Sequence, residues 1–409
     1  MHDATLTIDD LGPLPTKRPA SVAELGDLIR RAASTGDAIY PFGGQTQLGF
    51  GNPPVKLGSA VDLRGLAGVV DFPARDMTVT VQTGIAVDAL SRLLAKENLR
   101  LPIDVPQADA ATLGGIIAVN ASGPRRFGYG TLRDYVIGIS AVNDDGNEFK
   151  AGGRVVKNVA GYDLCKLLVG SFGTLGIITQ VTLKLRPLAE EKALVCIPCA
   201  SAQFGDLIDK LLTSRTRPVS LDAVNRATGL RVAQPSQATF PNEDWTVLVG
   251  YEGNPDAVKW QMQQVVKELG ASYAVEARIS CTACPLERAL IEGLGWPGAT
   301  LTLRASVLPS RVCGFLQALD VGEPAPHLHA HAGNGIVVGH YVDLGAERAA
   351  ALVKRWRASA GGPVVVVRCP TAWKADLDVW GPPPRDLSAM RQVHAKFDPR
   401  GIFNPGRFV

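Results

Sequence analysis

The sequence predicts an α+β protein built from two folded domains. Its 409 residues are 46% hydrophobic and 20% charged, which is the usage of ordinary folded domains. At about 150 residues per domain, this length favours two or three domains. Runs with strand and helix periodicity alternate along the chain, and the 43 glycines fall in clusters rather than at a regular period. Proline at residue 187 marks the expected boundary between the domains.

The first half predicts a helix followed by strands that break into glycine loops. Ser21 with Glu24 three residues later forms a capping box before apolar residues at helical spacing, so we expect a helix over 21–33. Apolar runs that stop at glycine or proline predict the strands of this half, within residues 38–54, 79–102, 135–143 and 176–187. The 79–102 segment continues through a turn into a second helix.

The second half predicts a sheet with helices between its strands. Strand-like runs occur at residues 193–200, 246–253, 299–309, 335–345 and 363–370. Runs with helical spacing occur at residues 204–214 and 257–270 and after residue 386. Strands that alternate with helices and polar gaps indicate a second α+β domain.

Charge and hydropathy exclude several classes of partner. Lys and Arg total 42 and Asp and Glu total 39, so the net charge of +3 predicts no nucleic-acid or other polyanion partner. Every apolar run is interrupted well before the ~20 residues of a membrane span, although peripheral attachment stays open. The acidic N-terminus has neither a basic leader nor an apolar core, and seven Cys residues are too few for a disulfide scaffold. We therefore expect a cytoplasmic protein with reduced thiols.

One glycine motif is interpreted as a turn rather than a nucleotide site. Gly293, Gly295 and Gly298 match G-x-G-x-x-G. A dinucleotide fingerprint needs a strand before the glycines and a helix after them. Here a helical run comes first and a strand-like run follows, with Pro297 inside the turn.

Two C-x-x-C pairs, Cys196/Cys199 and Cys281/Cys284, raise the question of a four-thiolate metal site. Zinc ribbons separate such pairs by about 15 to 20 residues, whereas these lie some 80 apart. The first pair also continues a strand, where residues i and i+3 face opposite sides. Buried or incidental thiols are the favoured interpretation, and no metal site is predicted.

Four of the six histidines, His327, His329, His331 and His340, fall within fourteen residues. Alternation along a strand points the first three to one face, where they could form a ligand or proton-transfer array. The alternative is a set of histidines packed on a rim or interface. His329 and His331 are the candidate catalytic residues.

Glycine clusters carry the stronger functional signal. Glycine frees the backbone to bring successive N–H groups toward an anion, and Thr46, Gln47, Thr112, Ser122 and Thr174 add side-chain donors. The sequence has no Walker lysine motif, so a nucleotide held this way would lie extended across several loops, which favours a dinucleotide. A single cluster is more often a turn. The clusters, in chain order, are PFGGQTQLG, TLGGIIAVNASG, RFGYG and GSFGTLGII.

In that order the clusters resemble the flavoprotein superfamily of p-cresol methylhydroxylase and vanillyl-alcohol oxidase, over residues 20–187. Residues 152–176 and 397–408 are more specifically similar to the FAD-binding (E) subunits of glycolate oxidase. This resemblance implies a two-subdomain FAD-binding domain at 1–188. It further implies a smaller α+β cap domain, an antiparallel sheet with helices, at 189–370, and a C-terminal segment at 371–409 that packs back on the FAD domain.

The same resemblance implies which residues contact FAD. The loop at 43–47 would wrap the diphosphate, a second stretch would follow the flavin and ribityl chain, a third would meet the adenine, and the C-terminal tail would return with Arg407 beside it. The implied contact residues are Phe42, Gly43, Gly44, Gln45, Thr46, Gln47, Pro106, Thr112, Gly114, Gly115, Asn120, Ser122, Gly123, Gly173, Ile177, Ile178 and Asn404.

A further block is recognisable without an assigned role, comprising Lys157, Asn158, Tyr162 and Asp163. These residues either touch flavin or brace the fold. For Asp163, the alternative is capping the helix that follows it.

Two departures from the family pattern are informative. Gln45 stands where covalently flavinylated relatives carry His, so we expect FAD to be held non-covalently. The metal-dependent 2-hydroxy-acid dehydrogenases of this superfamily carry H-x-G-D-G-N-x-H. In this chain His331 is kept, but Asn334 and Val338 replace the acid and the second His. The loss of a ligand implies that hydroxy-acid oxidation occurs on a partner subunit.

The leading hypothesis is an FAD-binding subunit of a glycolate-oxidase-like complex, beside a catalytic flavoprotein subunit and an iron–sulfur subunit. One alternative is a self-sufficient FAD oxidoreductase that oxidises a small 2-hydroxy acid with His329 or His331 as base. The other is a flavin-free structural partner that keeps the fold without the cofactor.

Overall fold

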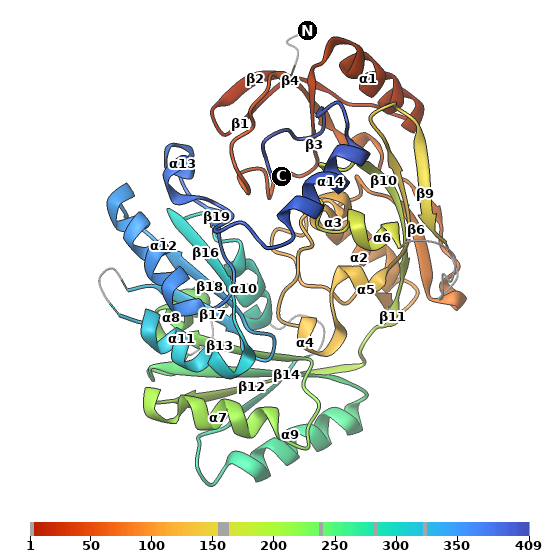
Figure 1. The fold of residues 1–409 in the computed structure, drawn as a ribbon. Coiled ribbons are helices and arrows are strands. Elements are labelled where there is room, and N and C mark those ends of the chain that lie inside the picture. The colour runs from red at the N-terminus through yellow and green to blue at the C-terminus, as the bar shows by residue number, and fades with distance from the viewer. Residues whose placement is uncertain (1–3, 154–162, 237–239, 281–284, 322–324, 409) are drawn as a thin grey trace. The chain divides into compact units, whose positions relative to one another are not determined.

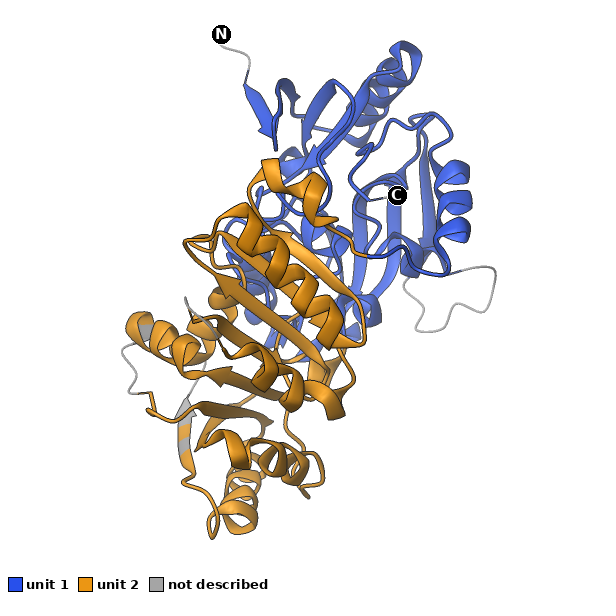
Figure 2. Cartoon of the chain, turned by 60° about the vertical axis from the view of Figure 1, so that its left-hand side comes forward, with its two compact units in different colours: residues 1–121, 131–188, 382–409 blue, residues 122–130, 189–381 orange. Residues whose placement is uncertain are grey.

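The computed structural model describes residues 4–153, 163–236, 240–280, 285–321 and 325–408 (Figure 1). The chain divides into two compact units (Figure 2). Unit 1 comprises residues 1–121, 131–188 and 382–409, and unit 2 comprises residues 122–130 and 189–381. Both units mix helices with sheets, which confirms the predicted α+β class.

Unit 1 begins with a four-stranded sheet in the order β1-β2-β4-β3, in which β4 runs parallel to both of its neighbours. Helix α1 has the predicted cap, because the Ser21 side chain accepts a hydrogen bond from Glu24 N and Glu24 in turn accepts one from Ala20 N. The elements are β1 (Thr5–Ile8), β2 (Leu11–Lys17), α1 (Val22–Thr35), β3 (Ala38–Phe42) and β4 (Gly58–Asp62).

The second sheet of unit 1 is antiparallel, in the order β5-β6-β10-β8-β9. Asp163 caps α6 by accepting a hydrogen bond from Lys166 N at 3.2 Å. Its strands are β5 (Val69–Asp71), β6 (Thr78–Gln82), β8 (Val136–Val142), β9 (Glu148–Gly152) and β10 (Ile177–Lys184). Strands β7 (Leu99–Arg100) and β11 (Arg186–Pro187) pair with each other in a separate two-stranded sheet. The helices are α2 (Val87–Ala95), α3 (Leu113–Ala118), α5 (Leu132–Tyr135), α6 (Leu164–Leu168) and α14 (Leu387–Phe397).

The C-terminal tail returns to the first sheet. Ile39 N donates to Ile402 O at 2.7 Å and Asn404 N donates to Ile39 O at 3.0 Å, so residues around Phe403 extend the sheet beside β3. Ile402 and Phe403 are fully buried. The tail is therefore part of the core of unit 1.

Unit 2 contains one eight-stranded antiparallel sheet, in the order β15-β12-β14-β13-β17-β18-β16-β19. The strands are β12 (Glu191–Cys199), β13 (Ser220–Asn225), β14 (Trp245–Gly253), β15 (Glu276–Ser280), β16 (Leu301–Ser306), β17 (His327–His331), β18 (Ile336–Tyr341) and β19 (Val364–Arg368). The helices are α4 (Arg126–Tyr129), α7 (Phe204–Leu212), α8 (Arg226–Ser236), α9 (Pro255–Leu269), α10 (Pro285–Leu294), α11 (Val312–Leu319), α12 (Ala346–Ala360) and α13 (Lys374–Leu377).

The two faces of this sheet differ in polarity. One face forms the main core of unit 2 and includes the stacked rings of Phe204 and Trp245, 4.7 Å apart. The other face has a smaller apolar cluster toward α8 and α10 and polar side chains on β13, β17 and β18. Cys196 packs in the smaller cluster and Cys199 in the main core, so this pair faces opposite sides of the sheet. Cys281 and Cys284 lie outside the described residues.

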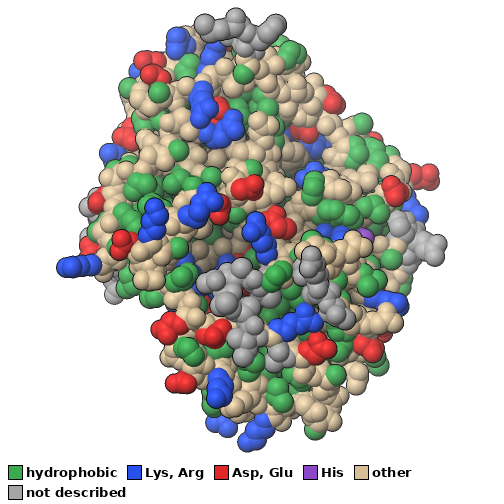
Figure 3. Space-filling model, turned by 180° about the vertical axis from the view of Figure 1, so that it is seen from behind, with side chains coloured by type: hydrophobic (Ala, Val, Ile, Leu, Met, Phe, Trp, Pro, Cys, Tyr) green, Lys and Arg blue, Asp and Glu red, His purple; other side chains and the backbone are tan. Residues whose placement is uncertain are grey.

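The surface charges and the lengths of the helices relate to two predictions made from the sequence, namely that the chain has no polyanion partner and no membrane span. Acidic and basic side chains are interspersed over the face seen in Figure 3. Among the described residues, none of the helices is both long enough and apolar enough to span a bilayer.

Candidate functional site

Unit 1 contains a cavity that is lined by residues of this unit. Four segments form most of its wall, namely the loop after β3, the start of α3, residues 172–178 and the C-terminal tail, and Ile8, Leu63 and Thr83 add to it. The predicted FAD-contact residues in this wall are Phe42, Gly43, Gly44, Gln45, Thr46, Gln47, Thr112, Gly114, Gly115, Gly173, Ile177, Ile178 and Asn404.

Four predicted contact residues lie elsewhere. Pro106 and Asn120 are not part of the cavity wall, although the buried Oδ1 of Asn120 has no hydrogen-bond partner among the described residues. Ser122 and Gly123 belong to unit 2. Lys157, Asn158 and Tyr162 lie outside the described residues.

The loop after β3 offers a row of free backbone donors. Within the described part of the chain, none of the five consecutive backbone N–H groups from Gly43 to Gln47 donates to a protein acceptor. Gln45 adopts φ 61°, a left-handed backbone conformation that residues other than glycine rarely adopt. Backbone N–H groups left unpaired next to a cavity are suited to bind an anion such as a diphosphate.

The glycines of this loop pack against protein. A Cβ on Gly44 would lie 1.7 Å from the carbonyl oxygen of Ala110, and one on Gly43 would lie 2.1 Å from Thr112 Oγ1. Both positions therefore allow two backbone segments to meet closely. The glycines were predicted to let the backbone come close to a bound anion. At Gly43 and Gly44 the backbone does meet a close neighbour, but that neighbour is another segment of the chain.

The start of α3 differs from the loop in its hydrogen bonding. Leu113 N donates to Ile85 O and Gly114 N donates to Thr83 O, at 2.9 and 2.8 Å. Gly115 N donates to the capping Thr112 Oγ1 at 3.4 Å. These three amides are occupied, so this segment shapes the cavity without offering them to a ligand.

The C-terminal tail holds the cavity wall together. Asn404 Nδ2 donates to Phe172 O at 2.8 Å. The buried Arg407 pairs with Asp9 at 2.7 Å and donates to the carbonyls of Asn52 and Phe50, each at 2.7 Å. Arg407 therefore braces the loop after β3 rather than presenting an unpaired charge to the cavity.

Apolar side chains complete the wall. The rings of Phe50 and Phe172 meet edge to face at 5.2 Å, and Leu63 and Val119 also line the cavity. These residues were not predicted, because single apolar residues in loops carry no sequence signal. A row of free amides flanked by apolar walls matches a charged diphosphate between two flat ring systems, so the residues present fit FAD.

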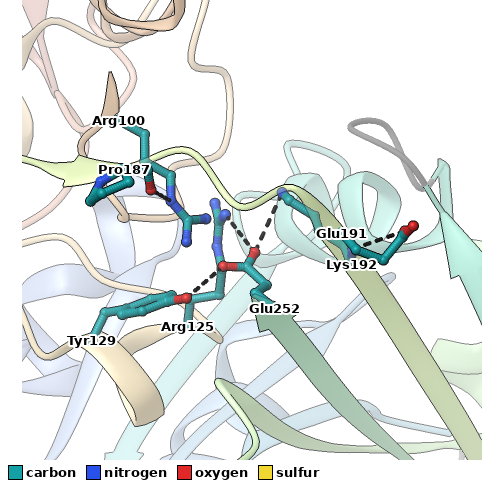
Figure 4. Close-up of polar contacts among 7 residues, drawn as sticks. All are labelled: Arg100, Arg125, Tyr129, Pro187, Glu191, Lys192 and Glu252. Carbon is teal, nitrogen blue, oxygen red and sulfur yellow. Dashed lines mark hydrogen bonds and ion pairs between the residues drawn. The ribbon is translucent and has the colours of Figure 1, made fainter. Parts of the chain in front are cut away.

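Residues 122–130, which follow the cavity segment at α3 in the sequence, belong to unit 2 and pack there. The carboxylate of Glu252, 3% exposed, lies 3.2 Å from Arg125 and 3.4 Å from Lys192, and Tyr129 Oη donates to it at 2.8 Å (Figure 4). Gly128 N also donates to Val219 O. The RFGYG cluster thus serves to dock α4 on the sheet of unit 2.

The polar face of the unit 2 sheet carries the predicted histidines. We call Asp222, His327, His329, His331 and His340 the histidine face. Asp222 Oδ1 lies 2.5 Å from His331 Nδ1 and 3.3 Å from His329 Nε2. Asp222, His329 and His331 are each 3% exposed, and β13 places Asp222 directly opposite His331 on β17.

The charge of this group follows from its burial and its partners. Burial raises the pKa of Asp222, but the neighbouring imidazoles, His331 above all, outweigh burial and leave this pKa lowered. Burial lowers the pKa of His329 despite its contact with Asp222. An ionised Asp222 accepts from the Nδ1–H of His331, which leaves Nε2 as the proton-accepting nitrogen of that ring. Asp222 was not predicted from the sequence. The available signal was its position as a lone acid within the mostly apolar run SLDAVN.

The same three side chains offer ligand atoms within 4.8 Å of one another. Ligands bound tetrahedrally to zinc at about 2.0–2.1 Å would lie roughly 3.3 Å apart. The 2.5 Å separation of Asp222 and His331 is the length of a strong hydrogen bond. Their geometry is therefore that of a hydrogen-bonded pair.

Comparison with protein families identifies the class. Residues 13–152 match the family described as FAD binding domain, and residues 382–408 match FAD linked oxidases, C-terminal domain. The second match covers the tail that completes the cavity wall. These two segments are therefore similar to FAD-linked oxidoreductases, and the cofactor of this chain is FAD.

Individual relatives refine this assignment. The chain is 25% identical to glycolate oxidase subunit GlcD of Bacillus subtilis over 99% of its own length and 91% of that protein. It is 32% identical to glycolate oxidase subunit GlcE of Escherichia coli over 39% of its length and 45% of that protein. The structure of p-cresol methylhydroxylase aligns with a TM-score of 0.70 at 14% identity, covering 96% of this chain and 88% of the other. The fold is therefore that of the predicted flavoprotein superfamily.

Proposed function

We propose that this chain is the FAD-binding subunit of a complex that oxidises a small 2-hydroxy acid such as glycolate. The observation that carries the proposal is the row of five free amides from Gly43 to Gln47 beside the cavity of unit 1. Two relatives are described as subunits of glycolate oxidase, which supports a role inside an assembly. Its partners would be a catalytic flavoprotein subunit and an iron–sulfur subunit, in the cytoplasm.

Each cavity segment would have its own part in holding the cofactor. The amides of residues 43–47 would bind the diphosphate, and the apolar residues Phe50 and Phe172 would cover the rings. Asn404 and Arg407 would fix the loop in its binding conformation through their bonds to backbone carbonyls. Bound FAD would supply the reversible two-electron acceptor chemistry of the complex.

Non-covalent attachment is part of the proposal. The side chain at the flavinylation position is the amide of Gln45, which is not a nucleophile. Denaturing the purified protein with acid is therefore expected to release all of its yellow chromophore into the supernatant. Flavin that stays in the protein pellet would overturn this part of the proposal.

Assembly can be tested by affinity purification of the tagged native protein. We expect a second flavoprotein and a protein with stoichiometric non-haem iron to copurify, and glycolate to reduce the flavin of the complex. The isolated chain, reconstituted with FAD, should turn over glycolate and D-lactate at least about 100-fold more slowly than the complex. Comparable turnover by the isolated chain would contradict the subunit proposal.

A second candidate is a self-sufficient FAD-dependent 2-hydroxy-acid dehydrogenase. The hydrogen bond between Asp222 and His331 favours it, because it leaves His331 Nε2 able to accept the proton of a substrate hydroxyl. An imidazolium formed there would be stabilised by the adjacent carboxylate. Robust turnover by the isolated chain that is lost in His331→Gln would support this function over the first.

A further inference from the structure

The turn that carries the literal G-x-G-x-x-G motif holds a guanidinium against an indole. The guanidinium of Arg231, on α8, lies over the ring of Trp296 with 4.5 Å to the centroid. A Cβ on Gly293 would lie 3.0 Å from Arg231 Nη2, and one on Gly298 would lie 2.9 Å from Trp296 Nε1. The glycines at both ends of the motif therefore make room for this stacked pair.

The guanidinium of Arg231 has few hydrogen-bond partners in the described protein around it. Within the described residues, its guanidinium makes one hydrogen bond, a long one of 3.5 Å from Nη2 to Gly293 O, and its buried Nε has no partner. Burial lowers the pKa of Arg231 to about 10, so the group stays charged at neutral pH. Arg231 is half-buried, and such a cation, with no carboxylate paired to it among the described residues, is costly unless an anion binds to it.

Two histidines next to the stacked pair are also incompletely bonded. The rings of His327 and His340 lie 4.9 and 5.9 Å from Trp296. His340 Nδ1 is 3.0 Å from Thr302 Oγ1, whereas His340 Nε2 and His327 Nδ1 are buried without partners among the described residues. When the Thr302 hydroxyl donates to Nδ1, the proton of the neutral His340 ring sits on Nε2 as a free donor.

We propose that Arg231, His327 and His340 bind the carboxylate of a small monocarboxylic acid, the 2-hydroxy acid or its 2-oxo product. One cation beside two neutral imidazoles suits a single negative charge. This assignment rests on the second candidate function, in which this chain oxidises the 2-hydroxy acid itself, and it names the substrate site of that function.

The proposal can be tested by calorimetric titration of the FAD-loaded full chain with glycolate, with neutral glycolamide as the matched ligand. We expect saturable glycolate binding that is at least tenfold tighter than glycolamide binding. Arg231→Gln should weaken glycolate binding at least tenfold, because a charge-assisted contact is lost. Arg231→Lys, which keeps the charge but not the planar fork, should weaken it less.

Arg226→Gln is the control, because Arg226 is exposed on the same helix. This variant should bind glycolate with the affinity of the unaltered chain. Gly293→Ala serves as a second variant that keeps every charge but crowds the guanidinium, and it should also weaken glycolate binding. FAD content and the thermal transition of each variant report folding. Equal glycolate binding by Arg231→Gln and Arg226→Gln, or glycolate binding no tighter than glycolamide binding, would overturn the proposal.

This outcome is distinguishable from failure of the second candidate function. If the isolated FAD-loaded chain turns over glycolate but Arg231→Gln leaves the affinity for glycolate unchanged, the carboxylate site alone is wrong. If the isolated chain neither binds nor turns over glycolate, both the site and the second candidate function are wrong.

Discussion

The cavity of unit 1 and the histidine face of unit 2 depend on different chemical groups, backbone amides in the first and side chains in the second. The cavity relies on backbone N–H groups, and its single charged wall residue, Arg407, is engaged by Asp9 and by carbonyl oxygens. The histidine face relies on buried side chains that hydrogen-bond to one another, as Asp222 and His331 do. A backbone site should tolerate changed side chains but not added Cβ atoms, whereas a side-chain site should respond to changes of charge and pH.

The sharpest test of this contrast is Gly44→Ala in the loop after β3. The new Cβ would lie 1.7 Å from Ala110 O, so the loop must shift and its amides would lose their alignment. Overpacking of this severity costs about 3 kcal/mol, equivalent to FAD binding weaker by about 100-fold. Fluorescence titration of the apoprotein with FAD measures this change.

Gly49→Ala is the matched control on the same loop, because a Cβ there would meet nothing within 4 Å. It should bind FAD within about twofold of the unaltered chain. If both variants bind FAD equally well, the loop does not form the FAD site.

A second test compares buried and exposed charge. Glu252 is 3% exposed between Arg125 and Lys192. Glu252→Gln leaves two partly buried cations without their counter-charge and should cost about 3 kcal/mol of unit 2 stability. All six tryptophans lie between residues 245 and 380, so their fluorescence in urea reports the unfolding of unit 2.

Asp27→Asn provides the comparison for Glu252. Asp27 pairs with Arg30 at 2.6 Å on the exposed surface of α1, where removing the charge should cost less than about 0.5 kcal/mol. If Glu252→Gln lowers the stability of unit 2 by no more than this amount, residues 122–130 are not held in place through the Glu252 carboxylate.

The histidine face should also make stability depend on pH. Burial lowers the pKa of His340 to about 3, whereas an unfolded histidine titrates near 6.5. As pH falls from 6.5 toward 3, the unfolded chain takes up a proton that folded His340 does not, so stability is full above pH 6.5 and decreases on acidification. The slope from this residue approaches about 1.4 kcal/mol per pH unit.

His340→Asn should make this slope shallower in urea unfolding followed by tryptophan fluorescence between pH 7 and 5. His394→Asn, in unit 1, should leave it unchanged. Equal slopes for His340→Asn and the unaltered chain would mean that His340 binds its proton in the folded state.

The two regions were predictable to different degrees. The loop at 43–47 could be located from sequence because a strand that ends in Gly-Gly is a local pattern. Which amides stay free could not be predicted, because the amides of Leu113 and Gly114 donate to the carbonyls of Ile85 and Thr83, about thirty residues earlier in the chain. Strand alternation similarly predicted that the histidines share a face.

Long-range pairing explains what the sequence did not reveal. Asp222 was missed because it meets His331 only through the pairing of β13 with β17. Ser122 follows the cavity segment closely in sequence, yet it belongs to unit 2, where Arg125 meets Glu252. Contacts between residues more than a hundred positions apart leave no local pattern.

The smallest expected effect concerns the capping hydroxyl in the cavity wall. Thr112→Ala removes the acceptor for Gly115 N, a loss of about 1 kcal/mol for a helix cap, and opens space beside Gly43. FAD binding should weaken about fivefold, well below the effect of Gly44→Ala, because the free amides at 43–47 remain. Thr112→Ser keeps the hydroxyl and should restore most of the affinity. A serine variant as weak as the alanine variant would show that the methyl group, and not the cap, supports the loop.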